Sequence, residues 1–535
     1  MNTSTVKITR IPAQEIPYYS QKDLAYQNLE EGYTPFYAFK PSMNGLKSAI
    51  SERKSFPVDR TLLHAELSRQ YAGRELSSAQ KRNLESILND NTYTVTTAHQ
   101  PSLLTGPLYY IFKIASTINL AERLNSENPD NHIVPIFISG GEDHDFDEIN
   151  HFRHFGKKYS WTRDDAGGSV GKMSLDGIQS VVDELFETYG SSPHAETLRE
   201  IVGKAIESAQ RYKDINAAIV HSLFRTYGLL YVDMDNEAMK RAFIPHIKTE
   251  ILTRNSQGLV LETQNKLAEA GYKSQAFPRD INFFLTSDNR RDRIEYVDGR
   301  YQIVNTEDHY SEEEILDLLD KQPERFSPNV VMRPIYQESI LPNLAYIGGG
   351  GEIAYWLERK SQFEAFNVFF PTLIRRNSAA LLPGSASKQL NKLDFSLADM
   401  LPVTDDIINN FLDTHSNIEL DFSAQKETME GLFNDLAEKA TSIDPTISKW
   451  IQAERTKQVK VIDQIEGRLR RSIKSKEETK VNQIRKLKDK LFPENNLQER
   501  KDNFMQFYLS HGAELIDMLV ENLNPLENDF LVVEL

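Results

Sequence analysis

A strand–helix–strand succession between residues 93 and 138 constrains the fold more than any other feature of the sequence. Residues 93–97 (YTVTT) are aromatic or β-branched, and residues 133–138 (IVPIFI) form a near-continuous apolar run, as is typical of strands. Between them, apolar residues recur at helical spacing from Leu108 to Leu124. An apolar run of this kind suits a strand buried on both faces of a parallel sheet, and a right-handed crossover joins such strands. The sequence therefore predicts an α/β fold with a parallel sheet.

Four later segments carry strand patterns that extend this sheet. They are Leu229–Val232, Asn329–Pro334, Ala345–Ile347 and Phe369–Ile374. The stretches at about 152–225 and 273–328 lie between strands and have mixed or helical character, so we interpret them as connecting insertions. These patterns predict a Rossmann-like core over residues 1–384 that carries two insertions.

Residues 385–535 have a different character, because strand patterns vanish and helix formers dominate. Two apolar stripes with spacings of 3 and 4, at residues 459–473 and 481–491, indicate a long helix with a coiled-coil seam. Pro493 ends this helix, and a closing helix is predicted at about 498–523. We predict a C-terminal α-helical coiled-coil domain over 385–535. We expect its apolar seam to pack within the core or against a second copy in a dimer. The alternative is that the seam docks a partner.

Charge and cysteine content narrow the classes of function. The chain has 62 Lys and Arg against 78 Asp and Glu, a formal net charge of −16, which disfavours coating of nucleic acid or of an anionic membrane. It has no cysteine, so disulfides, a thiolate nucleophile and Cys-ligated metals are excluded. The first residues lack the pattern of a signal peptide, and no stretch reaches 18 apolar residues. We expect a cytoplasmic protein that acts on small molecules, with no nucleic acid or membrane partner.

The most conspicuous polar cluster follows the second strand. Six of the seven positions from Glu142 to Glu148 are ionisable, at the carboxyl end of a strand, where open α/β sheets bind ligands. This concentration of charge calls for a cation, an ammonium group or shifted pKa values. The functional interpretations are a general base, metal ligation or recognition of an amine, and the alternative is a solvated acidic turn. Asp143, His144 and Asp145 are the catalytic candidates.

Two glycine-containing helix starts are candidates for binding phosphate or carboxylate. Thr105 precedes Gly106 and Pro107, and we predict that Thr105 is the N-cap of a helix whose free N–H groups suit an anion. Gly348–Gly351 precede Glu352 and a second helix, and they allow close backbone approach to a ligand. The glycine run is neither a Walker A motif nor a full dinucleotide fingerprint. The alternatives are a capped helix without a ligand and a plain tight turn.

Together these motifs resemble the bacillithiol biosynthesis cysteine-adding family. The matching segments are residues 97–113 (TAHQPSLLTGPLYYIFK), 141–151 (GEDHDFDEINH), 328–356 (PNVVMRPIYQESILPNLAYIGGGGEIAYW) and the C-terminal helices. Ala98 and Gly350 are small departures, because relatives usually show Gly at the first position and many show Pro at the second.

The resemblance implies a core similar to class I aminoacyl-tRNA synthetases and a coiled coil used for homodimerisation. It implies the final step of bacillithiol synthesis, in which L-cysteine is joined to glucosaminyl malate by an amide bond. We expect ATP or ADP as the cofactor, and we predict no metal. The binding candidates in the matching motifs are His99, Gln100, Thr105, Gly106, Tyr109, Lys113, Glu142, Asn150, Arg333, Gln337, Gly348, Gly349, Gly351, Glu352 and Tyr355.

Amide formation needs an activated carboxyl group, a deprotonated amine and stabilisation of the developing oxyanion. We predict that phosphate binds at the helix start near Thr105 or at the glycine run, and that the acidic cluster holds or deprotonates the glucosamine amine. Arg333 or Lys113 is expected to bind the malate carboxylates, since arginine forms bidentate pairs with them. The alternatives are a metal-dependent hydrolase built on Glu142–Asp147 and a non-catalytic coiled-coil scaffold for the pathway.

Overall fold

The computed structural model describes residues 7–164, 167–287, 289–415 and 421–535. It divides into two compact units. Met1–Leu381 together with Gln498–Val533 form one unit, called the core unit here, and Leu382–Leu497 form the other, called the arm unit. We predicted a single boundary after residue 384. The compact units divide differently, because the chain returns to the core unit after Leu497.

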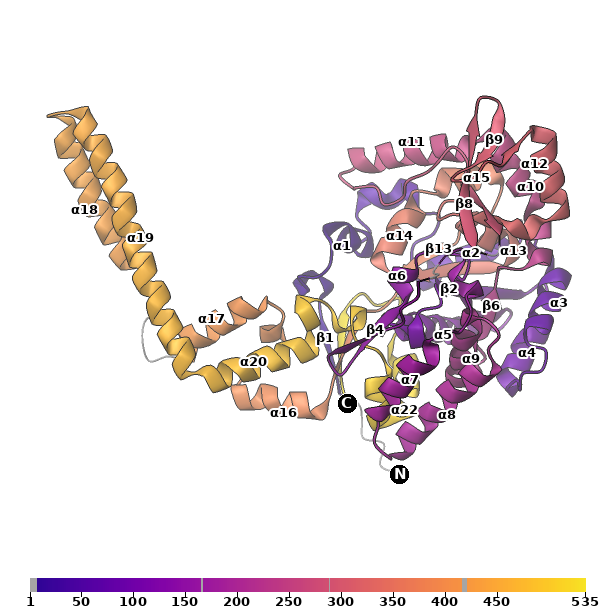
Figure 1. The fold of residues 1–535 in the computed structure, drawn as a ribbon, viewed down its shortest axis with the longest axis horizontal. Helices are drawn as coiled ribbons and strands as arrows, with labels where there is room; N and C mark the ends of the chain where they lie inside the picture. The colour runs from indigo at the N-terminus through magenta and orange to yellow at the C-terminus, as the bar shows by residue number, and fades with distance from the viewer. Residues whose placement is uncertain (1–6, 165–166, 288, 416–420) are drawn as a thin grey trace. The chain divides into compact units, whose positions relative to one another are not determined.

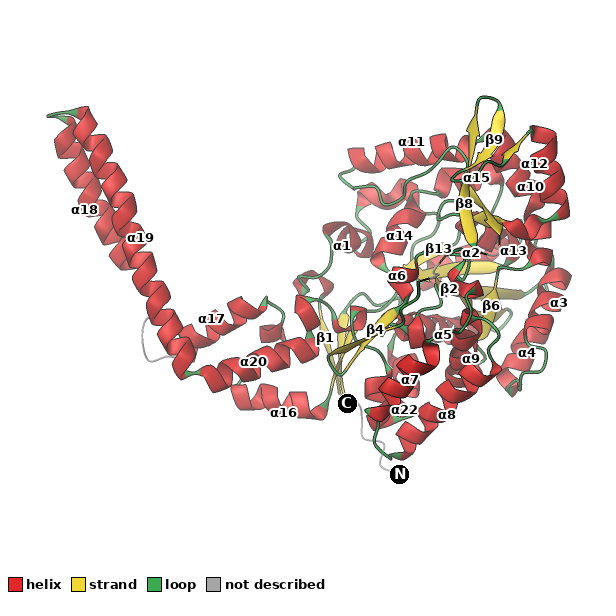
Figure 2. Ribbon diagram, viewed as in Figure 1, coloured by secondary structure: helices red, strands yellow, loops and turns green. Residues whose placement is uncertain are grey.

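A parallel sheet of five strands lies at the centre of the core unit (Figure 2). Its strand order is β13-β12-β2-β3-β6. The strands are β2 (Thr92–His99), β3 (His132–Ser139), β6 (Leu230–Asp233), β12 (Asn343–Gly348) and β13 (Thr372–Arg375). Every neighbouring pair in this sheet is parallel. The order reverses between β12 and β2, since β3 and β6 follow β2 on one side and β12 and β13 lie on the other. The predicted parallel sheet is confirmed.

Helices surround this sheet and connect its strands (Figure 1). Those before β2 are α1 (Gln21–Gln27), α2 (Met43–Arg53), α3 (Arg60–Gln70) and α4 (Ser78–Ser86). Those that follow are α5 (Tyr109–Glu127), α10 (Glu237–Thr253), α11 (Asn255–Glu269), α13 (Arg333–Ile340), α14 (Gly350–Leu357) and α15 (Lys360–Phe366). Near the C-terminus lie α21 (Met505–His511) and α22 (Glu514–Asn522), where we predicted one continuous helix. Gly512 separates the two and has a φ of +58°.

The segment 329–334 is a turn that leads into a helix, where we predicted a strand. α13 begins at Arg333, with Pro334 in its first turn. Proline is well tolerated there, because the first N–H groups of a helix have no intrahelical partner. The apolar run before it is too short to distinguish a strand from the approach to a helix. The strand predicted at Phe369–Ile374 exists as β13 but starts at Thr372.

Two insertions lie between strands of the central sheet. The first, after β3, contains α6 (Phe146–Ile149), β4 (His151–His154), β5 (Lys157–Ser160), α7 (Ile178–Glu187), α8 (Pro193–Ser208) and α9 (Tyr212–Phe224). The second contains α12 (Glu312–Lys321) and an antiparallel sheet of order β10-β9-β8-β7-β11. Its strands are β7 (Phe283–Ser287), β8 (Arg290–Val297), β9 (Arg300–Ile303), β10 (His309–Tyr310) and β11 (Phe326–Pro328).

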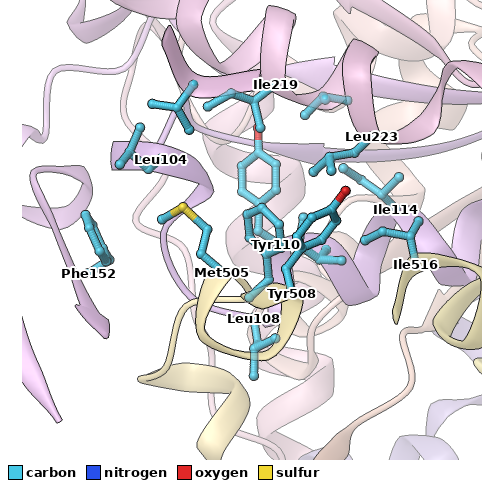
Figure 3. Close-up of a cluster of buried hydrophobic side chains, with 14 of the residues drawn as sticks. Leu104, Leu108, Tyr110, Ile114, Phe152, Ile219, Leu223, Met505, Tyr508 and Ile516 are labelled. Carbon is cyan, nitrogen blue, oxygen red and sulfur yellow. The ribbon is translucent and has the colours of Figure 1, made fainter. Parts of the chain in front are cut away.

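Both faces of the central sheet are buried. Val134, Ile136 and Ile138 of β3 belong to one hydrophobic cluster and Phe137 to another, because successive side chains of a strand point to opposite faces. The second cluster gathers around Tyr110 of α5, with side chains from α9, α21 and α22 (Figure 3). The last helices of the chain therefore complete the hydrophobic core that its first strands begin.

A third sheet brings the two ends of the chain together in the order β1-β15-β14. Its strands are β1 (Lys7–Ile11), β14 (Ala379–Leu382) and β15 (Phe530–Glu534). We expected no strand after residue 385, so β15 corrects that prediction. Its FLVVE sequence is a single short apolar run at the end of a helical region, which periodicity alone does not identify as a strand.

The arm unit is helical throughout the residues that the structure describes (Figure 2). It comprises α16 (Gly384–Leu393), α17 (Thr404–His415), α18 (Ser423–Thr441), α19 (Pro445–Lys476) and α20 (Glu478–Leu491). α18 and α19 pack side by side as a long hairpin (Figure 1). The predicted long helix is divided at Glu477, within its charged stretch. Among the described residues, no helix combines the length and the apolar character that a bilayer-crossing segment needs.

Candidate functional site

A cavity of about 730 Å³ in the core unit opens at the carboxyl ends of the central strands. β2 ends there at His99, β3 at Ser139 and β12 at Gly348, and the reversal of strand order between β12 and β2 lies at the same edge. Open α/β sheets bind ligands at such a position. Twelve of the predicted residues line it, namely His99, Gln100, Tyr109, Lys113, Glu142, Asp143, His144, Arg333, Gly349, Gly351, Glu352 and Tyr355.

A buried ion pair between Lys113 and Glu352 joins α5 to the glycine run. The Lys113 ammonium lies 2.5 Å from a Glu352 carboxylate oxygen and also donates to the Ala98 carbonyl at 3.0 Å. Glu352 accepts hydrogen bonds from the Gly349 N–H at 2.9 Å and the Tyr346 hydroxyl at 2.7 Å. Burial alone would raise the pKa of Glu352, but the Lys113 charge and these bonds outweigh it and lower the pKa to about 2. Glu352 is therefore an ionised cap of α14.

His99 and Gln100 connect this region to the acidic cluster. His99 Nδ1 lies 2.9 Å from the Gln100 carbonyl, and Nε2 lies 3.2 Å from the Tyr109 hydroxyl. Burial and the nearby Lys113 charge lower the pKa of His99 to about 4, so this imidazole is neutral at pH 7. Gln100 donates to Asp143 Oδ2 at 2.6 Å. The end of β2 thus positions a carboxylate that belongs to the next strand.

The acidic residues after β3 do not act as one cluster, because each has its own partner. Glu142 pairs with the buried Lys240 of α10. Asp143 Oδ1 accepts the His144 backbone N–H at 2.8 Å, while His144 Nδ1 lies 2.9 Å from a guanidinium nitrogen of Arg291. Within the described ranges, no three His, Asp or Glu side chains are grouped so that they could hold a metal ion.

Asp145 has a structural contact outside the cavity wall. Its carboxylate accepts the Glu148 N–H at 3.2 Å and caps the short helix α6. The other acidic pair that follows a strand, Asp233 and Asp235, also lies outside the wall and pairs with Lys213 at 2.5 Å and Lys172 at 3.0 Å.

Arg333 differs from the other basic residues of the wall that have described contacts. Its terminal nitrogens donate to the Gln337 amide oxygen at 3.1 Å and to the Tyr355 hydroxyl at 2.9 Å, and both partners are neutral. By contrast, Lys113 and Arg376 each pair with a carboxylate. A guanidinium with neutral partners in a cavity retains charge for an anionic ligand. Gln337 itself is buried behind Arg333 and does not line the cavity.

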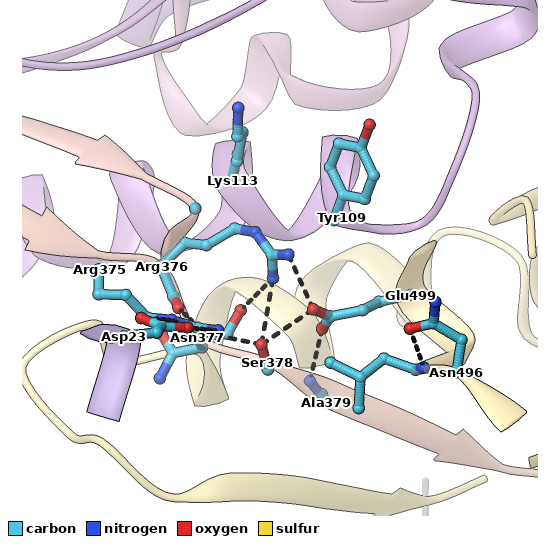
Figure 4. Close-up of polar contacts among 12 residues, drawn as sticks. Asp23, Tyr109, Lys113, Arg375, Arg376, Asn377, Ser378, Ala379, Asn496 and Glu499 are labelled. Atoms are coloured by element: carbon cyan, nitrogen blue, oxygen red, sulfur yellow. Dashed lines mark hydrogen bonds and ion pairs between the residues drawn. The ribbon is translucent and has the colours of Figure 1, made fainter. Parts of the chain in front are cut away.

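Arg376 enters the cavity from the loop after β13 and was not among the predicted residues. It donates to Glu499 at 2.8 Å and to the Asn377 carbonyl at 2.8 Å, and its guanidinium lies 5.3 Å from the centre of the Tyr109 ring (Figure 4). Among the residues that the structure describes, its buried Nε has no hydrogen-bond partner. This nitrogen lies 3.8 Å from the position that a Cβ on Gly349 would occupy, so it faces the glycine run.

Thr105 and Gly106 lie outside the cavity wall, and the predicted N-cap role of Thr105 is wrong. Leu104, Thr105 and Gly106 all have positive φ, at 45°, 69° and 59°, in a tight turn before the helix. An N-cap residue needs extended backbone geometry, which Thr105 does not have. α5 begins only at Tyr109. Within the described part of the chain, it has no side-chain cap and the buried Thr105 hydroxyl has no hydrogen-bond partner. Gly348 and Asn150 also lie outside the wall.

Sequence reasoning missed the basic residues that the second insertion and the C-terminal segment contribute. They are Arg279, Arg291, Arg293 and Arg500. The strand period would have placed Arg291 and Arg293 of β8 on one face, since residues two apart on a strand share a face. Arg500 follows the arm unit in the chain, and no local pattern connects it to residues of β2.

The comparisons with known proteins agree with this architecture. Residues 6–377 match the family described as "Bacillithiol biosynthesis BshC, N-terminal Rossmann-like domain", and residues 379–535 match "Bacillithiol biosynthesis BshC, C-terminal coiled-coil domain". The chain is 38% identical to "Putative cysteine ligase BshC" of Flavobacterium johnsoniae, over 98% of this chain and 99% of the relative. It is 39% identical to the protein of the same name in Christiangramia forsetii, over 97% of each, and 29% identical to that of Bacillus mycoides, over 93% and 94%.

A solved structure titled as a putative arginyl-tRNA synthetase from Campylobacter jejuni is 11% identical to the chain. It covers 84% of this chain and 95% of its own, with a TM-score of 0.24. That score carries no argument about the fold, so the likeness to synthetases stays a prediction.

Proposed function

The chain belongs to the bacillithiol biosynthesis BshC family, and from that premise we propose that it is the ligase that joins L-cysteine to glucosaminyl malate in the last step of the pathway. The observation that carries this proposal is that one cavity wall contains both a guanidinium with neutral partners, Arg333, and a largely buried carboxylate, Glu142. Arg333 suits a carboxylate of the malate group, and Glu142 suits the glucosamine amine.

Glu142 is better suited than Asp143 to accept the amine proton. Burial raises the pKa of Glu142, and the Lys240 ammonium only partly opposes this. A carboxylate with a raised pKa is a more effective base near neutral pH. Lys240 contacts one Glu142 oxygen, Oε1, and the side chain lies in the cavity wall. Asp143 differs because both of its oxygens already accept hydrogen bonds, from Gln100 and from the His144 N–H. Its role is to organise the wall.

The residues around the glycine run fit a triphosphate nucleotide. Gly351 has nothing within 4 Å of an added Cβ, so its backbone is open to a close approach. The buried Nε of Arg376 faces Gly349 and has no hydrogen-bond partner in the described ranges. We propose that these groups hold the phosphates of ATP, which when bound supplies the activation of the cysteine carboxyl. The chain's own residues hold the amine and the carboxyl close to each other, and different residues bind the charged groups of the two substrates.

We also propose that a second copy of the chain covers the exposed apolar side chains of the arm hairpin. Large hydrophobic residues on α18, on α19 and between them are at least 39% exposed, and within short groups they recur at spacings of 3 and 4, as is typical of a coiled-coil contact. They are Leu432, Leu436, Ile443, Ile447, Trp450, Val461, Ile465 and Leu469. Light scattering of the full chain should give the mass of a dimer, and Trp450→Glu should shift it toward the monomer. A monomeric wild type at micromolar concentration would refute the proposal.

The test of the ligase proposal is a mass-spectrometric assay of the purified full chain with glucosaminyl malate and cysteine, with and without ATP. The expected result is the amide product with ATP only. Glu142→Gln should reduce turnover by about 10²-fold, as the loss of a general base does. Arg325→Gln is the control, because Arg325 belongs to the second insertion and lies outside the cavity wall. Product without ATP would refute the nucleotide assignment, and no product in any condition would refute the ligase proposal.

A further inference from the structure

Arg291 of β8 is fixed in place by three separate contacts. Its guanidinium carbon lies 3.9 Å from the centre of the Phe284 ring. Its Nε donates to the Ser327 hydroxyl at 3.0 Å, and its Nη2 donates to the Pro328 carbonyl at 3.1 Å. The side chain is only 6% exposed. A guanidinium held on three sides has little freedom, so the direction of its remaining nitrogen is determined by the second insertion.

That remaining nitrogen, Nη1, contacts His144 Nδ1 at 2.9 Å. A guanidinium carries only donors, so Nδ1 must be the acceptor of this bond. A neutral imidazole has one proton, which therefore lies on Nε2. Asp143 Oδ1, 3.4 Å from the same Nδ1, would favour the opposite tautomer. The two neighbours of His144 thus compete for its tautomer, and Arg291 makes the shorter contact.

We infer that Arg291 is a positioning residue that keeps the His144 proton on Nε2, so that His144 presents an N–H donor to the cavity. The ring is about half exposed and lines the cavity. Its contacts with Arg291 and Asp143 are both made by Nδ1 and do not involve Nε2. This role rests on the proposed function. The His144 N–H donates to the carbonyl oxygen of the acyl group, where a preorganised donor stabilises developing negative charge. It replaces the predicted role of His144 as a base, because in this tautomer neither ring nitrogen is free to accept a proton.

The first test reads the tautomer without any substrate. The full chain is labelled with ring-¹⁵N histidine, and the His144 signals are identified by their loss in His144→Gln. The expected wild-type spectrum at pH 7.5 has a protonated Nε2 and an unprotonated Nδ1. Arg291→Met, which keeps much of the packing over Phe284, should move the proton toward Nδ1. Arg290→Gln on the same strand should leave the spectrum unchanged, because Arg290 contacts Asp292 and the Asn305 carbonyl instead. A wild-type Nδ1 that carries the proton overturns the inference, whether or not Arg291→Met folds.

The second test uses the two amide side chains as partial mimics of the ring. Glutamine at position 144 places an N–H donor near the Nε2 position, whereas asparagine reaches only the Nδ1 position. Loss of one such donor costs roughly 10²–10³-fold in turnover, so His144→Asn should lose about that factor and His144→Gln less than about 10-fold. Equal loss in the two variants would overturn the donor role. Absence of ligation by the wild type would refute the proposed function alone, since the tautomer is measured separately.

Discussion

Replacing Lys113 by methionine should strongly destabilise the core unit. The substitution leaves the Glu352 carboxylate in the wall of the cavity without its cation, 2.5 Å from where the ammonium lay. Breaking a buried pair from one side costs about 3–5 kcal/mol. The pKa of Glu352 gives a similar figure, because the difference between its ordinary value of 4.5 and about 2 corresponds to about 3 kcal/mol.

The double variant Lys113→Met with Glu352→Gln should recover about 2 kcal/mol or more of this loss. Glutamine is uncharged and can still accept the Gly349 N–H, as in a capping box. Coupling of this size is typical of residues in direct contact. If the single and double variants were equally unstable, the ion pair would not be the cause.

The assay is urea unfolding, monitored by tryptophan fluorescence in a Trp450→Phe background. Trp161 and Trp356 remain, and both are fully buried in the core unit, so the signal reports that unit. The pH dependence supplies a second check. Glu352 has a lowered pKa in the folded state, so its stabilisation is present above pH 4.5 and is lost as the pH falls toward 2. The Lys113→Met variant should lose less stability over that range, and a loss equal to that of the wild type would refute the reasoning.

Three further predictions concern single positions. Gly350→Ala should destabilise the core unit by about 1–3 kcal/mol in urea unfolding, because its Cβ would lie 2.5 Å from the Asp23 carboxylate. Gly351→Ala is the control and should be neutral, since its Cβ meets no described atom within 4 Å. Equal effects of the two variants would contradict this. Burial lowers the pKa of His154 to about 4, and neither ring nitrogen has a hydrogen-bond partner among the described residues. The wild type should therefore lose about 3 kcal/mol of stability as the pH falls from 6.5 to 4. His154→Phe should show a flatter pH profile in the same unfolding assay, and parallel profiles would speak against it. Arg333→Met should raise KM for glucosaminyl malate by about 10–100-fold, the value of a charged hydrogen bond, with little change in KM for cysteine; an unaltered KM for glucosaminyl malate would count against the malate assignment.

The central strands were predictable because they are short runs of apolar, aromatic or β-branched residues flanked by polar residues. β3 shows this best, since Ile133–Ile138 are buried on both faces. Polar residues that follow β2 and β3 lie in one cavity wall, because parallel strands bring their carboxyl ends to one edge. Thr105 and Arg333 show the limit of such reasoning. Thr105 has a left-handed backbone that its sequence context does not reveal, and the short apolar run before Arg333 suits a strand as well as a helix start.

The basic wall of the cavity could not be predicted from local patterns. Arg291 comes from an antiparallel insertion, and Arg376 is placed by its bond to Glu499, which is 123 residues away in the chain. Long-range pairs of this kind depend on the complete tertiary structure. The sequence motifs therefore identify the acidic and glycine-rich parts of the site, while most of its positive charge comes from elsewhere in the chain.

The division of the core unit into two chain segments has a consequence for how the protein is made. Residues 1–381 leave the ribosome without β15, which lies between β1 and β14, and without Asn503, which donates to the Leu104 and Gly106 carbonyls at 2.9 and 2.7 Å. Translation of the arm unit takes on the order of ten seconds at usual elongation rates. During that interval the nascent core exposes unpaired strand edges and apolar surface, which are the features that chaperones bind. The Leu381 N–H donates to the Gln498 amide oxygen at 2.8 Å, and the Gln498 amide donates to the Leu381 carbonyl at 3.1 Å. The two segments of the core unit are thus bonded at the point where the chain leaves this unit and returns to it. Because residues 1–381 are made first, the core unit completes its packing only after the segment that begins at Gln498 has been made.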